Sequence, residues 1–178
     1  TSRGLGDVYK RQVLEQNGYR QYEISNYAKA GYECRHNIGY WKRTDYLGMG
    51  LGAASLIDNV RYTNARDLFL YIEETSDIHA VPIEGVKHGM ATNLHEQADV
   101  VSRNAQIEEY MFLGLRMTEG ITRAEFRQTF GVEIEAVYAG ILPKLAEEGL
   151  IRMEAGVIRL TKRGTDISNY VLSQFLLD

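Results

Sequence analysis

Side chains that can bind a metal or stack on a flat molecule gather in one short segment of the chain: Cys34, His36, Asn37, Tyr40 and Trp41. A neutral imidazole is a common metal ligand, and Tyr and Trp offer flat apolar faces. Cys34 is the one cysteine, so it can neither form an internal disulfide nor hold by itself a zinc ion or an iron–sulfur cluster, which need about four ligands. A metal centre here would need further ligands from this chain or another.

Each of these side chains also has a structural interpretation. The ring nitrogens of His36 can hold Asn37 and the backbone of a loop in place. Aromatic residues that follow a loop usually anchor it to the core, so Tyr40 and Trp41 are expected either in the core or against a ligand. Residue types and spacing leave both interpretations open.

Composition places the chain among ordinary globular proteins. Of 178 residues, 44% are hydrophobic and 25% are charged. No apolar run approaches the roughly 20 residues that cross a bilayer, and we therefore expect no membrane span and a cytoplasmic protein. Residues 1–64 carry nine basic and six acidic side chains. A mildly basic, aromatic-rich segment suits an anionic planar ligand, although ordinary surface charge explains it equally well.

The elements that must position these residues follow from periodicity and turn signals. Residues 1–12 are interrupted by Gly4 and Gly6, and we expect them to be a truncated end or a sequence-assembly artefact. The pattern then predicts a helix end at 13–17 before Gly18, a short strand at 19–25, and an ordered loop at 27–45. A Gly-rich buried strand and turn at 46–57 and a helix at 65–74 with Asn64 as N-cap follow.

The second half of the chain has a different pattern. We expect a connector at 76–100, in which His79, His88 and His95 are solvated. Helical periodicity begins near 103, and Thr122 with Glu125 predicts a capping box for a second helix that ends before Gly131. A third helix at 133–148 contains an awkward Pro143, and a β-hairpin at 150–160 precedes a last helix at 166–176. Three helices followed by a hairpin is the winged-helix order.

The run YEISNYAKAGYECRHNIGYW, followed by DYLGMGLGAAS and VRYTN, resembles the HemW-type haem chaperones. These are radical S-adenosylmethionine proteins related to oxygen-independent coproporphyrinogen III oxidases. The later runs FLGLRMTEGI, LAEEGLI and LTKRGTDISNYVLSQFL resemble the same family, so that the likeness covers almost everything after residue 13. It implies an α/β fragment, the end of a partial TIM-like barrel, at 13–75. The connector at 76–100 and a mostly α, winged-helix-like domain at 101–178 would follow.

The resemblance also implies a function, the binding and transfer of haem. The HN-x-x-YW block falls on His36, Asn37, Tyr40 and Trp41, with His36 as iron ligand and Cys34 as a second candidate. Arg35, Lys42 or Arg43 would pair with the propionates. Haem or a porphyrin, and a haem-acceptor protein, are the implied partners.

Cofactor residues are implied less fully. Gly52 and Ala53 would contact S-adenosylmethionine, but tight packing explains a G-x-G-x-G run equally well. The family often has GAHS where this chain has Gly52-Ala53-Ala54-Ser55, so no role of a histidine carries over. The C-x-x-x-C-x-x-C motif is absent, so S-adenosylmethionine and a [4Fe–4S] cluster are implied for the full-length parent only, and this chain alone is not expected to be catalytic.

Two alternatives stand beside the chaperone. One is a fragment of a coproporphyrinogen III oxidase of porphyrin biosynthesis. The other is a winged-helix nucleic-acid-binding module, which charge disfavours, because residues 122–149 hold three basic and five acidic side chains. We therefore expect an accessory or protein-interaction domain that binds no nucleic acid. Exposed strand edges would favour self-association.

Overall fold

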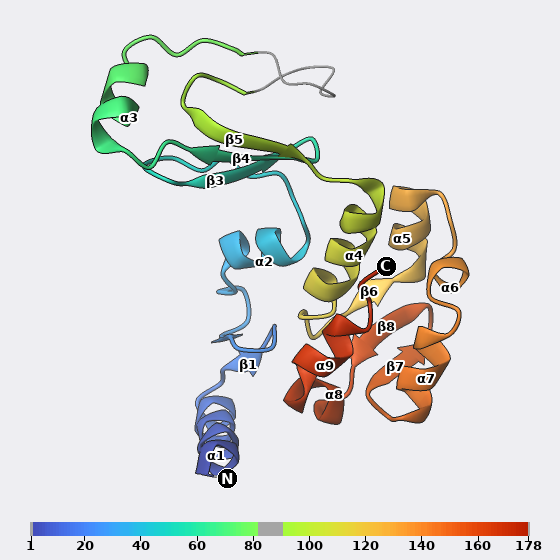
Figure 1. The fold of residues 1–178 in the computed structure, drawn as a ribbon. Helices are drawn as coiled ribbons and strands as arrows, with labels where there is room; N and C mark the ends of the chain where they lie inside the picture. The colour runs from blue at the N-terminus through green and yellow to red at the C-terminus, as the bar shows by residue number, and fades with distance from the viewer. Residues whose placement is uncertain (1, 82–90, 178) are drawn as a thin grey trace. The chain divides into compact units, whose positions relative to one another are not determined.

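The computed structural model describes residues 2–81 and 91–177, with the side chains of residues 2–7 left aside. The chain divides into two compact units, one of residues 1–43 with 107–178 and the other of residues 44–106 (Figure 1). His88, which was expected to be a solvated histidine of the connector, lies outside the described residues. No helix in the described ranges is both long and apolar enough to cross a bilayer.

The first unit begins with α1 (Ser2–Gln16), β1 (Arg20–Gln21), β2 (Tyr27–Ala28) and α2 (Arg35–Trp41). Helix α1 ends as predicted, because Gly18 adopts a φ of 79° and Tyr19 N–H donates to the Leu14 carbonyl at 2.9 Å. The helix is continuous through residue 12, and the interpretation of residues 1–12 as a truncated end or an assembly artefact stays a prediction. Helix α2 corrects the expectation that 27–45 is a loop throughout.

The rest of this unit comprises α4 (Arg103–Gly114), β6 (Ile121–Thr122), α5 (Arg123–Phe130), α6 (Ile134–Val137), α7 (Ile141–Glu147), β7 (Ile151–Glu154), β8 (Val157–Leu160), α8 (Lys162–Asp166) and α9 (Ser168–Ser173). The predicted helices and hairpin are confirmed, and the three strands form an antiparallel sheet in the order β6-β8-β7. The helix expected at 133–148 is split into α6 and α7, and the helix expected at 166–176 is the shorter α9, with α8 before it. Pro143 lies in the first turn of α7, where its missing N–H breaks no helical hydrogen bond.

A single apolar cluster holds these helices against the sheet. Met111, Phe126 and Leu145 are fully buried within it, and the Tyr138 hydroxyl donates to the Phe175 carbonyl at 3.0 Å. The capping box is present: Thr122 Oγ1 accepts from Glu125 N–H at 3.1 Å. This packed body is the platform on which the N-terminal segment of the unit is fixed.

The second unit is a three-stranded antiparallel meander, β3 (Ala54–Ile57), β4 (Val60–Asn64) and β5 (His95–Val100), with helix α3 (Leu68–Glu74). Three expectations are corrected here. The strand expected from 46 begins at Ala54, the N-cap of α3 is Asp67 rather than Asn64, and the expected connector contains β5. Asp67 accepts from Leu70 N–H at 2.9 Å, whereas Asn64 is the last residue of β4.

The predicted mixture of helix and strand is therefore confirmed. The paired strands within the described residues form small antiparallel sheets, of two, three and three strands. The end of a parallel barrel stays a prediction.

Candidate functional site

Helix α2 presents part of the predicted ligand block to solvent. Cys34 is its N-cap residue and is exposed, and its side chain makes no capping hydrogen bond. His36 and Tyr40 are one helical turn apart, with ring centroids separated by 4.7 Å at an interplanar angle of 83°. His36 is exposed and Tyr40 is 36% exposed. The two rings and the thiol are thus accessible on a seven-residue helix.

The structural interpretation of His36 finds no support. Within the described residues, neither ring nitrogen of His36 forms a hydrogen bond with Asn37 or with the backbone. Asn37 is half-buried. The imidazole contacts the Tyr40 ring and otherwise faces solvent, and its nitrogens are therefore available to a ligand.

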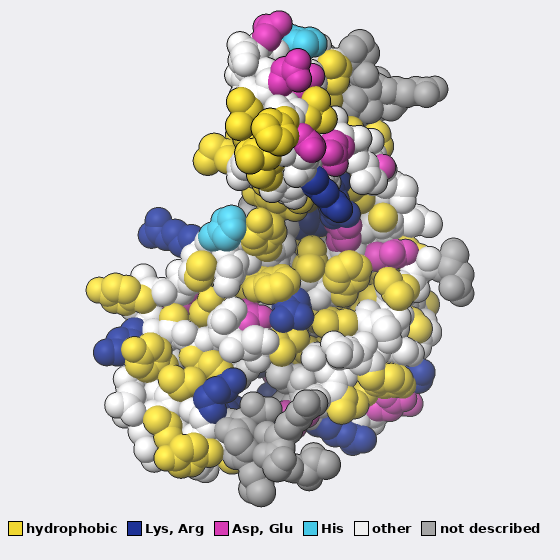
Figure 2. Space-filling model, turned by 60° about the vertical axis from the view of Figure 1, so that its left-hand side comes forward, with side chains coloured by type: hydrophobic (Ala, Val, Ile, Leu, Met, Phe, Trp, Pro, Cys, Tyr) yellow, Lys and Arg dark blue, Asp and Glu magenta, His cyan; other side chains and the backbone are white. Residues whose placement is uncertain are grey.

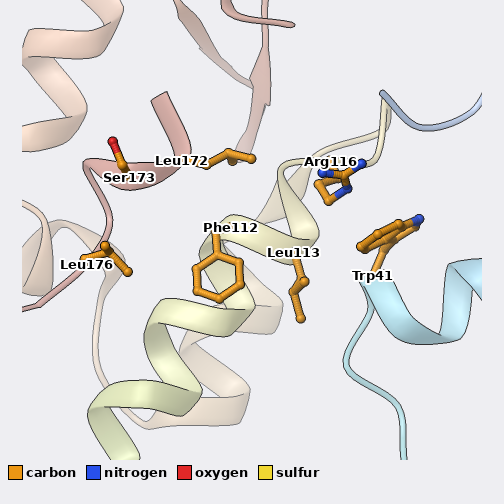
Figure 3. A pocket seen from close by; sticks show the side chains of 7 residues that line it. All are labelled: Trp41, Phe112, Leu113, Arg116, Leu172, Ser173 and Leu176. Atoms are coloured by element: carbon orange, nitrogen blue, oxygen red, sulfur yellow. The ribbon is translucent and has the colours of Figure 1, made fainter. Parts of the chain in front are cut away.

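Trp41 lies on the other side of α2. The Arg116 guanidinium carbon is 4.2 Å from the centroid of its indole, and Figure 3 shows the two side chains facing each other beside Leu113. Arg116 Nη2 is also 3.3 Å from Oε2 of Glu23, which is fully buried. Glu23 Oε1 accepts from Ser25 N–H at 2.7 Å. A buried carboxylate, a guanidinium and an indole therefore form one stack.

The cations expected to meet propionates are mostly engaged within the chain. Lys42 Nζ lies 2.7 Å from Glu119, and Arg43 Nε lies 2.7 Å from Glu109. The Arg43 and Glu109 side chains are only 11% and 12% exposed. Arg35 is exposed and forms no hydrogen bond or ion pair with the part of the chain that the structure describes. Arg35 is thus the best placed of the three for an anionic ligand.

A cavity of about 330 Å³ begins beside the stack. It is lined by Trp41, Phe112, Leu113, Arg116, Leu172, Ser173 and Leu176 (Figure 3). The lining is mostly apolar, and Arg116 is its one charged member. It is a shallow groove on the first unit, at the low end of the size range for small-molecule pockets.

The glycine run belongs to the other unit and forms a turn. Asn64 Nδ2 donates to the Gly48 and Gly50 carbonyls at 3.3 and 2.9 Å, and Gly48 N–H donates to Ser55 Oγ at 2.9 Å. Gly52 has a φ of 61°, and its N–H donates to the Ala65 carbonyl at 3.0 Å. The turn accounts for these glycines by itself, and a cofactor contact of Gly52 and Ala53 stays a prediction.

The described histidines outside α2 differ from each other. His79 is exposed, as predicted, and its Nδ1 lies 3.0 Å from the Asp77 carbonyl. His95 is half-buried in β5, stacks on Tyr62 at 4.8 Å and accepts from Thr92 N–H at Nδ1, so the expectation of a solvated His95 is wrong. Burial lowers the pKa of His95 below its usual 6.5. The described residues hold no group of three or more metal-ligating side chains.

Sequence reasoning missed the side chains that hold α2: Glu23, Glu109, Arg116 and Glu119. One signal for them was available, since Arg116 stands between the apolar residues Leu115 and Met117 at the end of a helical pattern. A charge in that position suggests a specific partner. Spacing along the chain could not identify Glu23 as that partner, since 93 positions separate them.

Comparison with known proteins shows the family to which the chain belongs. The family model described as the HemN C-terminal domain matches residues 101–167. "Heme chaperone HemW" of Lactococcus lactis is 34% identical over 170 residues, which cover 96% of this chain and 41% of that protein. The Bacillus subtilis protein of the same name is 36% identical over 163 residues, which cover 92% of this chain and 40% of that protein. The chain belongs to the HemW-type family.

A solved structure agrees with this at the level of fold. The Escherichia coli structure titled "Coproporphyrinogen III oxidase (HemN) from Escherichia coli is a Radical SAM enzyme" matches with a TM-score of 0.66 at 18% identity, over 94% of this chain and 39% of that chain. This HemW-type chain thus spans about two fifths of the length of its relatives.

Proposed function

We propose that this chain is the haem-handling part of a HemW-type haem chaperone, and that haem binds to the exposed side of α2. One observation carries the proposal: the His36 imidazole is exposed and has no hydrogen bond within the described chain. The relatives named "Heme chaperone HemW" support it. Figure 2 shows basic and acidic side chains interspersed with hydrophobic ones, so the face that it draws has no single sign of charge.

The residues fit haem by the chemistry of their donors. His36 would supply an imidazole ligand to the iron, with the exposed Cys34 thiol as a second candidate. Tyr40 would pack against the macrocycle, and Arg35 would pair with a propionate. Trp41 lies under Arg116, so we assign it to holding the site rather than to direct contact. The part of Asn37 stays a prediction.

The finer fold assignments belong to the same proposal. The order of α4, α5, α7 and the β7–β8 hairpin supports a winged-helix-like domain, and the resemblance supports a barrel end before it. S-adenosylmethionine and a [4Fe–4S] cluster are proposed for the longer parent protein, because one cysteine cannot supply three thiolates. A haem-acceptor protein would be the partner of the full protein.

The nucleic-acid alternative is weakened by ion pairs on α5. Arg123 pairs with Glu135, and Arg127 Nη1 lies 3.3 Å from Glu133. They are the two basic residues of α5, and they lie within residues 122–149, where a recognition helix would be expected. Because their charges are offset within the chain, we expect no electrophoretic shift of duplex DNA even at low salt.

A haemin titration followed by absorbance tests the proposed site. We expect saturable binding with a shifted Soret band for the wild-type chain, and loss of that shift in His36→Ala. His79→Ala is the matched control, because His79 is also an exposed histidine. Equal binding by all three proteins would remove His36 from the site. The oxidase alternative would gain if the anaerobic full-length parent turned over coproporphyrinogen.

A further inference from the structure

The end of α2 is held by charged side chains from the domain that follows it. Glu109, Arg116 and Glu119 contact Arg43, Trp41 and Lys42 in turn. All three lie within residues 101–167, the part matched by the HemN C-terminal domain model. The contacts fall on Trp41, the last residue of α2, and on the two residues that follow it, so the domain holds the helix at its C-terminal end.

Arg116 is the central contact, and its orientation is fixed from two sides. Its guanidinium stacks on Trp41 at 4.2 Å and pairs with buried Glu23 at 3.3 Å. The backbone next to it is fixed as well, since Ile24 N–H donates to the Arg116 carbonyl at 3.0 Å and Thr118 N–H to the Tyr22 carbonyl at 3.1 Å. A planar guanidinium can stack and pair at the same time, whereas an ammonium is a point charge.

At Arg43 the contact with the domain also involves the backbone conformation of the chain after α2. It follows the helix with a φ of 55°, in the left-handed region that disfavours residues other than glycine. Its side chain is nearly buried against Glu109, and its Nε lies 2.7 Å from that carboxylate. The ion pair holds the unfavourable backbone conformation, and the direction in which the chain leaves α2 is thereby set.

We propose that Arg116 is a positioning residue, through which the domain at 101–167 fixes α2 and so presents His36 to haem. The inference rests on the proposed function of α2. It assigns a task to the C-terminal domain: a platform for the haem-binding helix. Arg116 acts through the half-buried Trp41 rather than through the exposed His36 and Tyr40 rings, and need not contact the ligand.

The test uses Trp41, which is the one tryptophan of the chain. In Arg116→Lys the charge remains but the stack is lost, so we expect red-shifted Trp41 emission and stronger acrylamide quenching without haemin. Haemin affinity should fall by about ten-fold, as for residues that orient metal ligands. The matched control is Arg123→Lys, an arginine of the same domain that pairs with Glu135 rather than with α2. Glu23→Gln, which keeps the side-chain shape, should give a smaller change in the same direction.

The outcomes distinguish the positioning role of Arg116 from the proposed binding of haem at α2. Unchanged Trp41 emission in Arg116→Lys would overturn the positioning role. Changed emission with wild-type haemin affinity would show that the stack is structural only, and would also overturn it. Absence of haemin binding by the folded wild-type chain would overturn the proposed function, and with it the claim that Arg116 presents His36 to haem. The Trp41 emission of the variants would still show whether Arg116 orders α2.

Discussion

Glu23 carries a fully buried carboxylate, and among the described residues its charged partner is a single side chain. Arg116 Nη2 lies 3.3 Å away and keeps 24% of its side chain exposed. Two donors in the same stack, Trp41 Nε1 and Arg116 Nε, are buried and have no hydrogen-bond partner within the described residues. The stack is therefore maintained by packing and by the ion pair. The loss of one member leaves the remaining polar groups buried without a partner.

Arg116→Met should for this reason destabilise the protein by about 3 kcal/mol, at the low end for breaking a buried ion pair because Arg116 is partly exposed. Denaturant unfolding at pH 7 measures it. Arg127→Met is the control, since Arg127 and Glu133 are 66% and 54% exposed and their pair is worth under about 1 kcal/mol. Equal losses in the two variants would contradict the special status of Glu23.

At the scale of elements, local capping and close backbone packing decide where helices and turns form. Thr122 closes a capping box on α5, and Gly131 ends that helix with a φ of 68°. At position 48 a glycine is required by close packing, since a Cβ there would lie 2.2 Å from the Ala54 carbonyl oxygen. These features act within a few residues or between adjacent strands, and each can be tested in isolation.

Removing the Thr122 cap should cost about 1 kcal/mol, because Glu125 N–H then loses its acceptor. Thr122→Ala is compared with Thr129→Ala, which lies inside α5 and is exposed. Thermal unfolding should show a lower Tm for the first and an unchanged or slightly higher Tm for the second, since alanine favours helix interiors.

Gly48→Ala should destabilise the second unit by at least about 2 kcal/mol, because the overlap is with backbone that cannot rotate away. Gly140→Ala is the control, as an added Cβ there meets nothing within 4 Å. Hydrogen exchange of the β3–β4 amides is the measurement. Equal protection in Gly48→Ala and wild type would contradict the assigned role of this turn.

At the scale of the whole molecule, the two units differ in the size of their apolar clusters, and we expect them to differ in their sensitivity to acid. The first unit is held by a large apolar cluster, whereas the second has a small one around Val60, Tyr62 and Ala91. His95 lies in the second unit, stacked on Tyr62. Its pKa is lowered by burial, so the second unit should be the part that is sensitive to mild acid.

The direction of this pH dependence follows from the difference in proton binding between the folded and the unfolded chain. The unfolded chain binds a proton at His95 near pH 6.5, and the folded chain only at lower pH, so stability falls as pH drops from about 6.5 through the folded pKa. Thermal unfolding between pH 7.5 and pH 5 should therefore show a steeper loss for wild type than for His95→Gln, which cannot titrate there. His79→Gln should behave like wild type. A His95→Gln profile parallel to the wild-type one would contradict the assignment.

Several features were determined by the sequence alone, because short-range interactions decide them. The end of α1 at Gly18, the capping box of α5 and the β7–β8 hairpin were all predictable from neighbouring residues. The segment from His36 to Trp41 could be named as a candidate site for the same reason, since its residues are close together in the chain, whereas its assignment to haem came from the resemblance and stays a proposal. Pro143 indicated that the helix expected at 133–148 would be interrupted, but the sequence did not show at which residue.

Tertiary structure decided which side of the block faces solvent. His36 and Tyr40 are exposed, whereas Trp41 is half-buried with Arg116 over its indole, and Arg116 is oriented by Glu23, 93 positions away in the chain. Likewise, Asn64 organises the glycine turn from the next strand rather than capping a helix. Such partners are selected by packing in three dimensions, where burial makes an unpaired charge or amide costly, and no local pattern in the sequence specifies them.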